Sequence, residues 1–281
     1  MLDKPLVIVQ YARMYADHFG LSETPFKITP DPRFLWYSEQ HKEAKSKIEF
    51  HISQKDGPVY LSAEVGLGKT SIAQRLRDEF AADPTKKVVL AFAPNLKTAN
   101  QFMRFIAEEF EVKTARAYAD TLKNFQLYLI EQYKAGISPV LLIDEAQNLT
   151  YDTLKTIHHL FNFTTKNEFL IQIALFGQPE LRKRIQRFKS LESRMYMAKL
   201  QPFNLRQTHE MMQFRWTVAG GKKLPFDDEA IEEIYRLTGG IARNICKLAN
   251  EALLRTMIEK HKLVNKDMIM AAAADAFEQT Q

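Results

Sequence analysis

The sequence contains little cysteine and no long apolar run. Cys246 is the single cysteine among 281 residues, so an intrachain disulfide is excluded and a reducing compartment is expected. No apolar run approaches the roughly 20 residues that a membrane-spanning helix needs. The N-terminal apolar patch is short and follows Asp3, which is not typical of a signal peptide. We therefore expect a cytoplasmic protein with no membrane partner.

The overall composition excludes few classes of protein. Hydrophobic residues make up 46% of the chain and charged residues 26%, which is typical of a globular protein that buries a sizeable core. The length suits one large domain or two smaller ones. The formal net charge of +5 permits a polyanionic partner, although nucleotide-binding proteins are often mildly basic as well. Composition alone therefore leaves nucleic-acid binding open.

A glycine-rich stretch between an apolar run and a helical pattern is the strongest motif. The run Val59–Leu61 predicts a strand, and the apolar spacing from Ile72 predicts a helix. In such a loop, glycines let backbone N–H groups point at phosphate oxygens, and the helix N-terminus adds positive charge. The residues expected to bind ATP phosphates are Glu64, Val65, Gly66, Leu67, Gly68, Lys69, Thr70 and Ser71. Lys69 should reach the β- and γ-phosphates, and the Thr70 hydroxyl should ligate Mg²⁺.

Two adjacent carboxylates end a later apolar run, PVLLIDEAQN at residues 139–148. Ligands gather at the carboxyl ends of buried parallel strands, so both side chains are expected near the phosphate loop. We expect Asp144 to hold Mg²⁺, mainly through water, and Glu145 to polarise the water that attacks the γ-phosphate. Many strands simply end in acidic residues. Here the alternating strand–helix pattern after a phosphate loop favours the catalytic interpretation.

Gln178 and Arg194 are further candidates for the site. Gln178 follows the apolar run 169–176 and is expected at a strand tip, where its amide would hold the attacking water or the γ-phosphate; a plain turn residue is the alternative. Arg194 precedes a strand-like run at 195–200 and is expected to reach a neighbouring subunit's nucleotide. The other basic residues of this stretch, which usually form a solvated face, are Arg182, Lys183, Arg184, Arg187 and Lys189.

The chain divides into three predicted regions. Residues 1–38 form an N-terminal arm and a Pro/aromatic strap, 39–203 an α/β core with a parallel sheet flanked by helices, and 204–281 a small helical lid. Strap residues that either line an adenine pocket or, as we favour, cover apolar surface are Phe26, Pro30, Phe34 and Trp36. The lid helices are predicted at about 205–218, 227–237, 240–259 and 265–278. Arg243, near the start of the third, can turn toward phosphates.

Several motifs in chain order resemble the AAA+ ATPases of the ExeA/TnsC group. They are FGL-x-x-x-PF-x-x-x-PDPRFL, EVGLGKT, LLIDEAQNL, FGQPEL, LESR and GGIARNICKLANEALL, spread over about residues 15–260. The resemblance implies a P-loop NTPase (AAA+) fold, ATP and Mg²⁺ as cofactors, and ATP hydrolysis. It also implies a sensor-1 role for Gln178, an arginine finger at Arg194 and a sensor-2 role for Arg243. Ala63 and Ala242 replace a usual glycine and proline without removing a catalytic group, and Ala63 is tolerated if its φ stays negative.

Two functions share this architecture. ExeA-like secretion ATPases carry a membrane span and a peptidoglycan-binding domain after the ATPase, whereas TnsC-like regulators polymerise with ATP on double-stranded DNA. Because this chain shows neither extra domain and is basic, we expect an ATP-dependent regulator of DNA transposition, linking target-site recognition to a transposase. Its partners would be a transposase, a target-selector protein and copies of itself in a ring or helical filament. The alternative is an ExeA-like secretion ATPase, truncated or stand-alone; a non-catalytic scaffold is disfavoured by intact Lys69, Asp144 and Glu145.

Two short loops are the predicted DNA contacts. In TnsC-like proteins such loops follow the second strand and the next helix, and here they correspond to about residues 95–100 and 112–116. The residues expected to contact phosphates of double-stranded DNA, in a sequence-tolerant way, are Lys97, Thr98, Lys113, Thr114 and Arg116. Ordinary solvated loops are the alternative.

Overall fold

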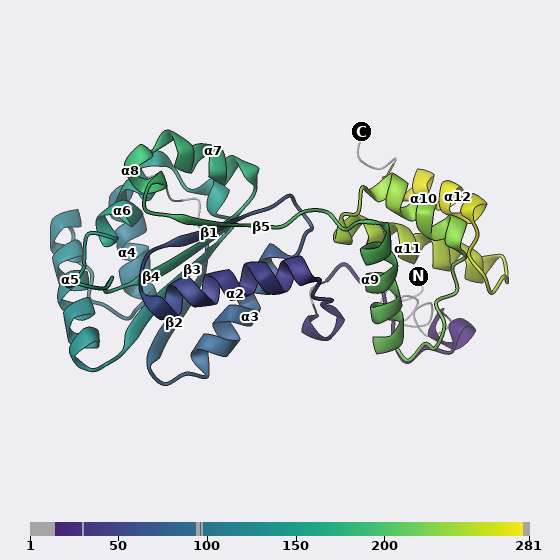
Figure 1. Cartoon of the computed structure of the whole chain (residues 1–281), viewed down its shortest axis with the longest axis horizontal. Coiled ribbons are helices and arrows are strands. Elements are labelled where there is room, and N and C mark those ends of the chain that lie inside the picture. Colours follow the sequence, from purple (N-terminus) through teal and green to yellow (C-terminus); the bar gives the residue numbers. More distant parts are fainter. Residues whose placement is uncertain (1–14, 30, 94–95, 97, 278–281) are drawn as a thin grey trace, which may run out of the picture. The chain divides into compact units, whose positions relative to one another are not determined.

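The chain forms two compact units in the computed structural model, which describes residues 15–29, 31–93, 96 and 98–277 (Figure 1). One unit spans Glu39–Gln201, and the other combines the chain up to Ser38 with the stretch from Pro202 onward. The strap therefore belongs with the C-terminal helices and does not stand apart as its own region. No helix of the described residues is long and apolar enough to cross a membrane.

A five-stranded, all-parallel sheet is the centre of the unit Glu39–Gln201, with strand order β2-β3-β4-β1-β5. The strands are β1 (Val59–Ser62), β2 (Lys86–Phe92), β3 (Ser138–Asp144), β4 (Gln172–Gly177) and β5 (Tyr196–Lys199). Strands β1, β3 and β4 are buried along almost their whole length, which explains why their sequences read as continuous apolar runs. This architecture confirms the predicted α/β fold.

Helices flank the sheet (Figure 1). They are α2 (Glu39–Gln54), α3 (Lys69–Ala81), α4 (Ala99–Glu109), α5 (Tyr118–Lys134), α6 (Tyr151–Leu160), α7 (Pro179–Arg187), α8 (Lys189–Glu192) and the short 3-10 helix η2 (Ala146–Asn148). Helix α4 illustrates how the sequence determines where a helix begins and which of its faces is buried. Thr98 accepts a hydrogen bond from the Gln101 backbone at its start, and Phe102 and Ile106 are fully buried on one face.

The fourth strand is shorter than its apolar run predicts. Its run begins at Phe169, but β4 begins at Gln172. Phe169 instead forms an antiparallel bridge with Thr164, and the Gln172 amide donates to the Phe169 carbonyl at 2.8 Å. The connection thus turns back on itself before the strand enters the sheet, and a run of apolar letters does not reveal that turn.

The second unit is helical, as the sequence predicts. Its helices are α9 (Leu205–Val218), α10 (Asp228–Thr238), α11 (Ala242–Ile258) and α12 (Lys266–Phe277), together with the 3-10 helix η1 (Pro32–Phe34) of the strap. Phe26 and Phe34 are buried in the core of these helices, with Trp36 packed against it. Arg215 of α9 donates to backbone carbonyls of the strap at distances between 2.8 and 3.3 Å. These contacts favour a strap that covers apolar surface; Pro30 lies outside the described residues.

The turn before α11 brings two backbones into very close contact. Gly240 has a φ of +73°, and a Cβ placed on it would meet the Phe203 carbonyl oxygen at 1.9 Å. In the opposite direction, the Phe203 N–H donates to the Gly240 carbonyl at 2.9 Å. Only glycine fits here, because any side chain would strain the left-handed backbone and collide with the facing chain.

Candidate functional site

Three chemically active segments converge because β3, β4 and β1 are neighbours in a parallel sheet. The phosphate loop follows β1, the Asp144–Glu145 pair ends β3, and Gln178 follows β4. The Ala63 N–H donates to the Gly177 carbonyl at 3.1 Å, which ties the first residue of the loop to the end of β4. The carboxyl edge of the sheet therefore holds the predicted phosphate, metal and water-binding groups together.

The phosphate loop depends on two glycines in the left-handed region, Gly66 with a φ of +84° and Gly68 with a φ of +91°. Ala63 lies outside the positive-φ region, so its Cβ introduces no backbone strain. Leu67 is buried and anchors the loop, whereas Glu64 and Val65 are exposed on it. Helix α3 begins directly after Gly68, so its first N–H groups face the loop.

Lys69 lies inside the curve of this loop. The residue is only 6% exposed, and its ammonium donates to the carbonyls of Ala63 at 2.9 Å and Glu64 at 2.8 Å. A buried ammonium needs such partners, because taking it out of water is otherwise very unfavourable. A phosphate in the loop would provide stronger, charge-assisted partners at the same place.

His41 of α2 contacts the backbone of the phosphate loop. The sequence analysis did not predict this contact. Its Nε2 lies 2.9 Å from the Leu67 carbonyl, and a Cβ on Gly68 would lie 3.2 Å from the same nitrogen. Burial lowers the pKa of His41, which favours the neutral ring at neutral pH, with the Nε2 proton donated to the carbonyl. The sequence gives no signal for this contact, because α2 precedes the loop and its sequence suggests only a capped helix with lysines on its polar side.

The candidate magnesium site consists of oxygen atoms from the first turn of α3 and from the end of β3. The Thr70 hydroxyl donates to Asp144 Oδ2 at 2.6 Å, and Asp144 Oδ1 accepts from the Glu145 N–H at 2.8 Å. Hydroxyl and carboxylate oxygens suit Mg²⁺, which also keeps water and substrate phosphate oxygens as ligands. No cluster of three or more His, Cys, Asp or Glu residues able to hold a metal occurs in the described part of the chain. The Thr70 and Asp144 oxygens suit an ion that takes its other ligands from water and phosphate.

Glu145 and Gln178 are connected through Gln147, the second residue that the sequence analysis missed. The Gln147 amide donates to Glu145 Oε2 at 2.5 Å, and its carbonyl oxygen accepts from the Gln178 N–H at 3.1 Å. Gln147 is 8% exposed. In the sequence, its position two residues after Glu145 in the DEAQN motif is what could have indicated a role beside that carboxylate. The structure places both predicted residues at this connection, while the role of the Gln178 side chain stays a prediction.

Arg194 lies away from this site. It precedes β5 and so belongs to the amino edge of the sheet, opposite the phosphate loop. Its guanidinium is exposed and donates to Asn162 Oδ1 at 3.0 Å.

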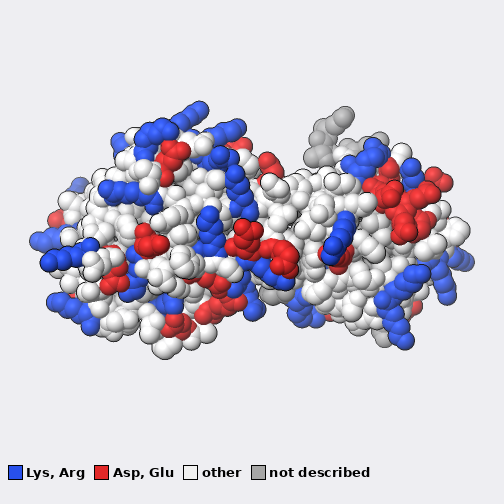
Figure 2. Space-filling model, viewed as in Figure 1, with Lys and Arg blue, Asp and Glu red and all other residues white. Residues whose placement is uncertain are grey.

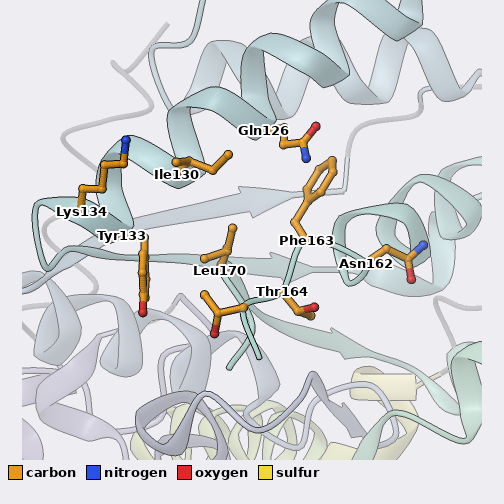
Figure 3. A pocket seen from close by; sticks show the side chains of 9 residues that line it. Gln126, Ile130, Tyr133, Lys134, Asn162, Phe163, Thr164 and Leu170 are labelled. Atoms are coloured by element: carbon orange, nitrogen blue, oxygen red, sulfur yellow. The ribbon is translucent and has the colours of Figure 1, made fainter. Parts of the chain in front are cut away.

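Asn162 lines a cavity of about 380 Å³ between the end of α5 and the connection before β4 (Figure 3). The other lining residues are Gln126, Ile130, Tyr133, Lys134, Phe163, Thr164, Thr165 and Leu170.

The remaining predicted residues stay predictions. Arg243 is exposed at the second position of α11, in the helical unit. Lys97 lies outside the described residues, and the Thr98 hydroxyl is engaged in capping α4. Asn100, the last residue of the first candidate DNA loop, contacts the second loop, because its amide donates to the Arg116 carbonyl at 3.3 Å. The Lys113 and Arg116 side chains are exposed there, and Thr114 is half-buried.

The sequence of this chain is similar to those of known proteins. Residues 52–185 match the family model described as AAA domain. The chain is 32% identical over 268 residues to "General secretion pathway protein A" of Aeromonas hydrophila. That match covers 92% of this chain and 48% of the other, so the chain spans about half the length of this relative.

Solved structures share the fold at low sequence identity. Aeropyrum pernix ORC2 in its ADPNP-ADP complexes has a TM-score of 0.66 at 14% identity, covering 92% of this chain and 72% of that one. Drosophila ORC bound to DNA has a TM-score of 0.68 at 16% identity, covering 93% and 65%. The Thermotoga maritima RuvB Holliday junction branch migration motor has a TM-score of 0.53 at 15% identity, covering 82% and 67%.

The buried Asp144 carboxylate leads to a prediction about stability. Burial raises its pKa, so its contribution to stability is largest below the unfolded pKa of 3.8 and is lost as the pH rises through the folded value. Asn at this position can still accept from the Glu145 N–H and donate to Thr70. Asp144→Asn should therefore raise the free energy of unfolding at pH 7, measured by thermal or urea unfolding without nucleotide.

The gain should shrink toward pH 4, and Mg²⁺-dependent nucleotide binding should weaken in the same variant. Asp78→Asn, on an α3 side chain that is 58% exposed, is the matched control and should change neither property. A less stable Asp144→Asn protein at pH 7 would contradict the assignment of a carboxylate destabilised by burial.

Proposed function

We propose that the AAA+ ATPase domain of this chain, whose residues 52–185 match the AAA domain family, hydrolyses ATP to drive a step of protein secretion. The convergence of Lys69, Asp144 and Glu145 at one sheet edge carries the hydrolysis part of this proposal. The 32% identity to General secretion pathway protein A over most of this chain supports the secretion part.

Each residue at the carboxyl edge has a distinct task in this proposal. Lys69 and the loop N–H groups bind the β- and γ-phosphates, while Thr70 and Asp144 hold the cation. Bound Mg²⁺ would supply charge neutralisation on the phosphate oxygens. The Glu145 carboxylate accepts a hydrogen bond from the attacking water and orients it, and Gln178 provides a polar group beside it. Arg243 is proposed to approach the phosphates from the helical unit.

Assembly of copies would complete the site. A chain that carries its phosphate loop at one sheet edge and Arg194 at the other cannot use that arginine on its own nucleotide. Head-to-tail stacking would place the Arg194 of one copy at the phosphates of the next, and such heterologous contacts generate rings or helical filaments. The exposed guanidinium, which donates to Asn162 at the surface, suits this use.

A transposition regulator, the function expected first from the sequence, becomes the second proposal. The secretion-related relative favours the alternative. What still supports double-stranded DNA as a partner, with a transposase and a target selector, is the pair of adjoining loops that expose Lys113 and Arg116. Lys and Arg side chains are interspersed with Asp and Glu on the face in Figure 2, which gives no support to a single basic surface there.

Substitutions of Lys69 and Glu145 should separate binding from turnover. Lys69→Ala removes the charge that anchors the phosphates, so the Kd for a fluorescent ATP analogue should rise at least about tenfold. Glu145→Gln keeps the shape but polarises water less, so binding should persist while kcat falls about 100-fold or more. Phosphate release gives kcat. A Glu145→Gln protein that turns over ATP at the wild-type rate would overturn the proposal.

Mixing two inactive variants tests the shared site. Arg194→Ala should bind nucleotide but hydrolyse it slowly, because the neighbouring site lacks its arginine. In equal mixtures with Glu145→Gln, about a quarter of the sites should pair an intact Glu145 with a neighbour's Arg194 and regain activity, if copies assemble at random. Arg187→Ala, an exposed arginine on α7, is the control. Absence of recovery at every ratio, with assembly intact, would contradict the role of Arg194.

Duplex DNA discriminates the two proposed functions. Under the secretion proposal, we expect duplex DNA at low salt to change ATP hydrolysis by less than about twofold and to support no ATP-dependent filaments in electron micrographs. DNA-bound filaments that disappear in a Lys113→Ala/Arg116→Ala variant, but persist in a charge-matched Lys123→Ala/Lys134→Ala variant, would instead establish the transposition alternative.

A further inference from the structure

We infer that Gln147 is a positioning residue that fixes the Glu145 carboxylate against the tip of β4. The inference rests on the proposed hydrolysis of ATP and names a residue that acts through Glu145, to which its amide donates a hydrogen bond. Three local features of the carboxyl edge support it.

The first feature is the backbone at Glu145. The residue has a φ of +53°, in the left-handed region that non-glycine residues seldom adopt. It stands between the end of β3 and η2, so neither strand nor α-helix geometry directs its side chain. Some other contact must therefore hold the carboxylate, and the 2.5 Å hydrogen bond from the Gln147 amide does so. A donor to an ionised acceptor makes one of the stronger hydrogen bonds in proteins.

The second feature is the opposite end of the Gln147 amide. Its oxygen accepts from the Gln178 N–H, which stands at the N-cap of α7. Rotating the amide by half a turn would place its NH₂ group against that N–H and its oxygen against the carboxylate. Only one orientation pairs both ends, so the two neighbours determine it uniquely.

The third feature is the space that Gly177 leaves for the amide. A Cβ on Gly177 would lie 3.1 Å from Gln147 Oε1 and 2.7 Å from a methyl group of Leu181. The last residue of β4 therefore lacks a side chain where the amide passes. With Gln147 only 8% exposed, bulk water competes little for its two hydrogen bonds.

The consequence is a selective dependence of catalysis on Gln147. Phosphate binding uses Lys69 and the loop, whereas water activation uses Glu145, to which the Gln147 amide donates a hydrogen bond. Misplacing a catalytic group by about 1 Å can lower a rate about 100-fold. Loss of Gln147 should therefore lower kcat and leave nucleotide affinity almost unchanged.

Two substitutions distinguish positioning from simple loop support. Gln147→Leu removes both hydrogen bonds, whereas Gln147→Glu retains an acceptor for the Gln178 N–H but replaces the donor to Glu145 by a like charge. We expect both to lower kcat about 10- to 100-fold, with the Kd for an ATP analogue within about twofold of wild type. If Gln147→Glu keeps the wild-type kcat, support of the loop through Gln178 is sufficient and the inference is wrong.

A matched control and a double variant complete the test. Gln172→Leu removes another buried glutamine, at the amino end of β4, whose amide donates to the Phe169 carbonyl, and should leave kcat unchanged. In a Glu145→Gln background, Gln147→Leu should lower the residual single-turnover rate little further, because both changes act through one group. A full additional loss would overturn the inference. A wild-type protein without ATP hydrolysis would instead defeat the proposed function itself.

Discussion

The parallel pairing of β1 with β4 and of β4 with β3 is the constraint on which the site depends. Because these strands point the same way, each delivers its following residues to one edge. The hydrogen bond from Ala63 to Gly177 extends the β1–β4 pairing by one residue, into the phosphate loop. A slip of register in either ladder would separate the loop from the carboxylates, since neighbouring residues face opposite sides of a sheet.

The active groups at this edge are buried polar residues held by protein partners. Lys69, Asp144, His41 and Gln147 are each less than 9% exposed, and all four have hydrogen-bond partners in the loop or the strand ends. Buried polar groups stabilise a fold only weakly, but they leave few alternative arrangements when every partner is satisfied. The buried polar groups at this edge therefore add little to the stability of the fold but hold the side chains of the site in fixed positions, as is common at functional sites.

The sequence predicted what depends on neighbouring residues in the chain. Apolar runs, the glycine loop and the Asp-Glu pair are local patterns, and the lid helices were placed within a few residues of their observed bounds. Contacts between distant segments were missed. His41 reaches the loop from a helix that precedes β1, and Gln147 acquires its meaning only when β4 lies beside β3. The strap likewise joins helices far along the chain, a pairing that no periodicity encodes.

The close contact between Gly240 and Phe203 has a mechanical consequence. The chain leaves the sheet unit at Gln201, and two residues later its backbone is locked to the turn that begins α11. Within the helical unit, the entering chain and the turn before α11 are therefore fixed to each other. Arg243 stands one helical position beyond that start. A side chain at position 240 would therefore displace both the entering chain and the turn that precedes this arginine.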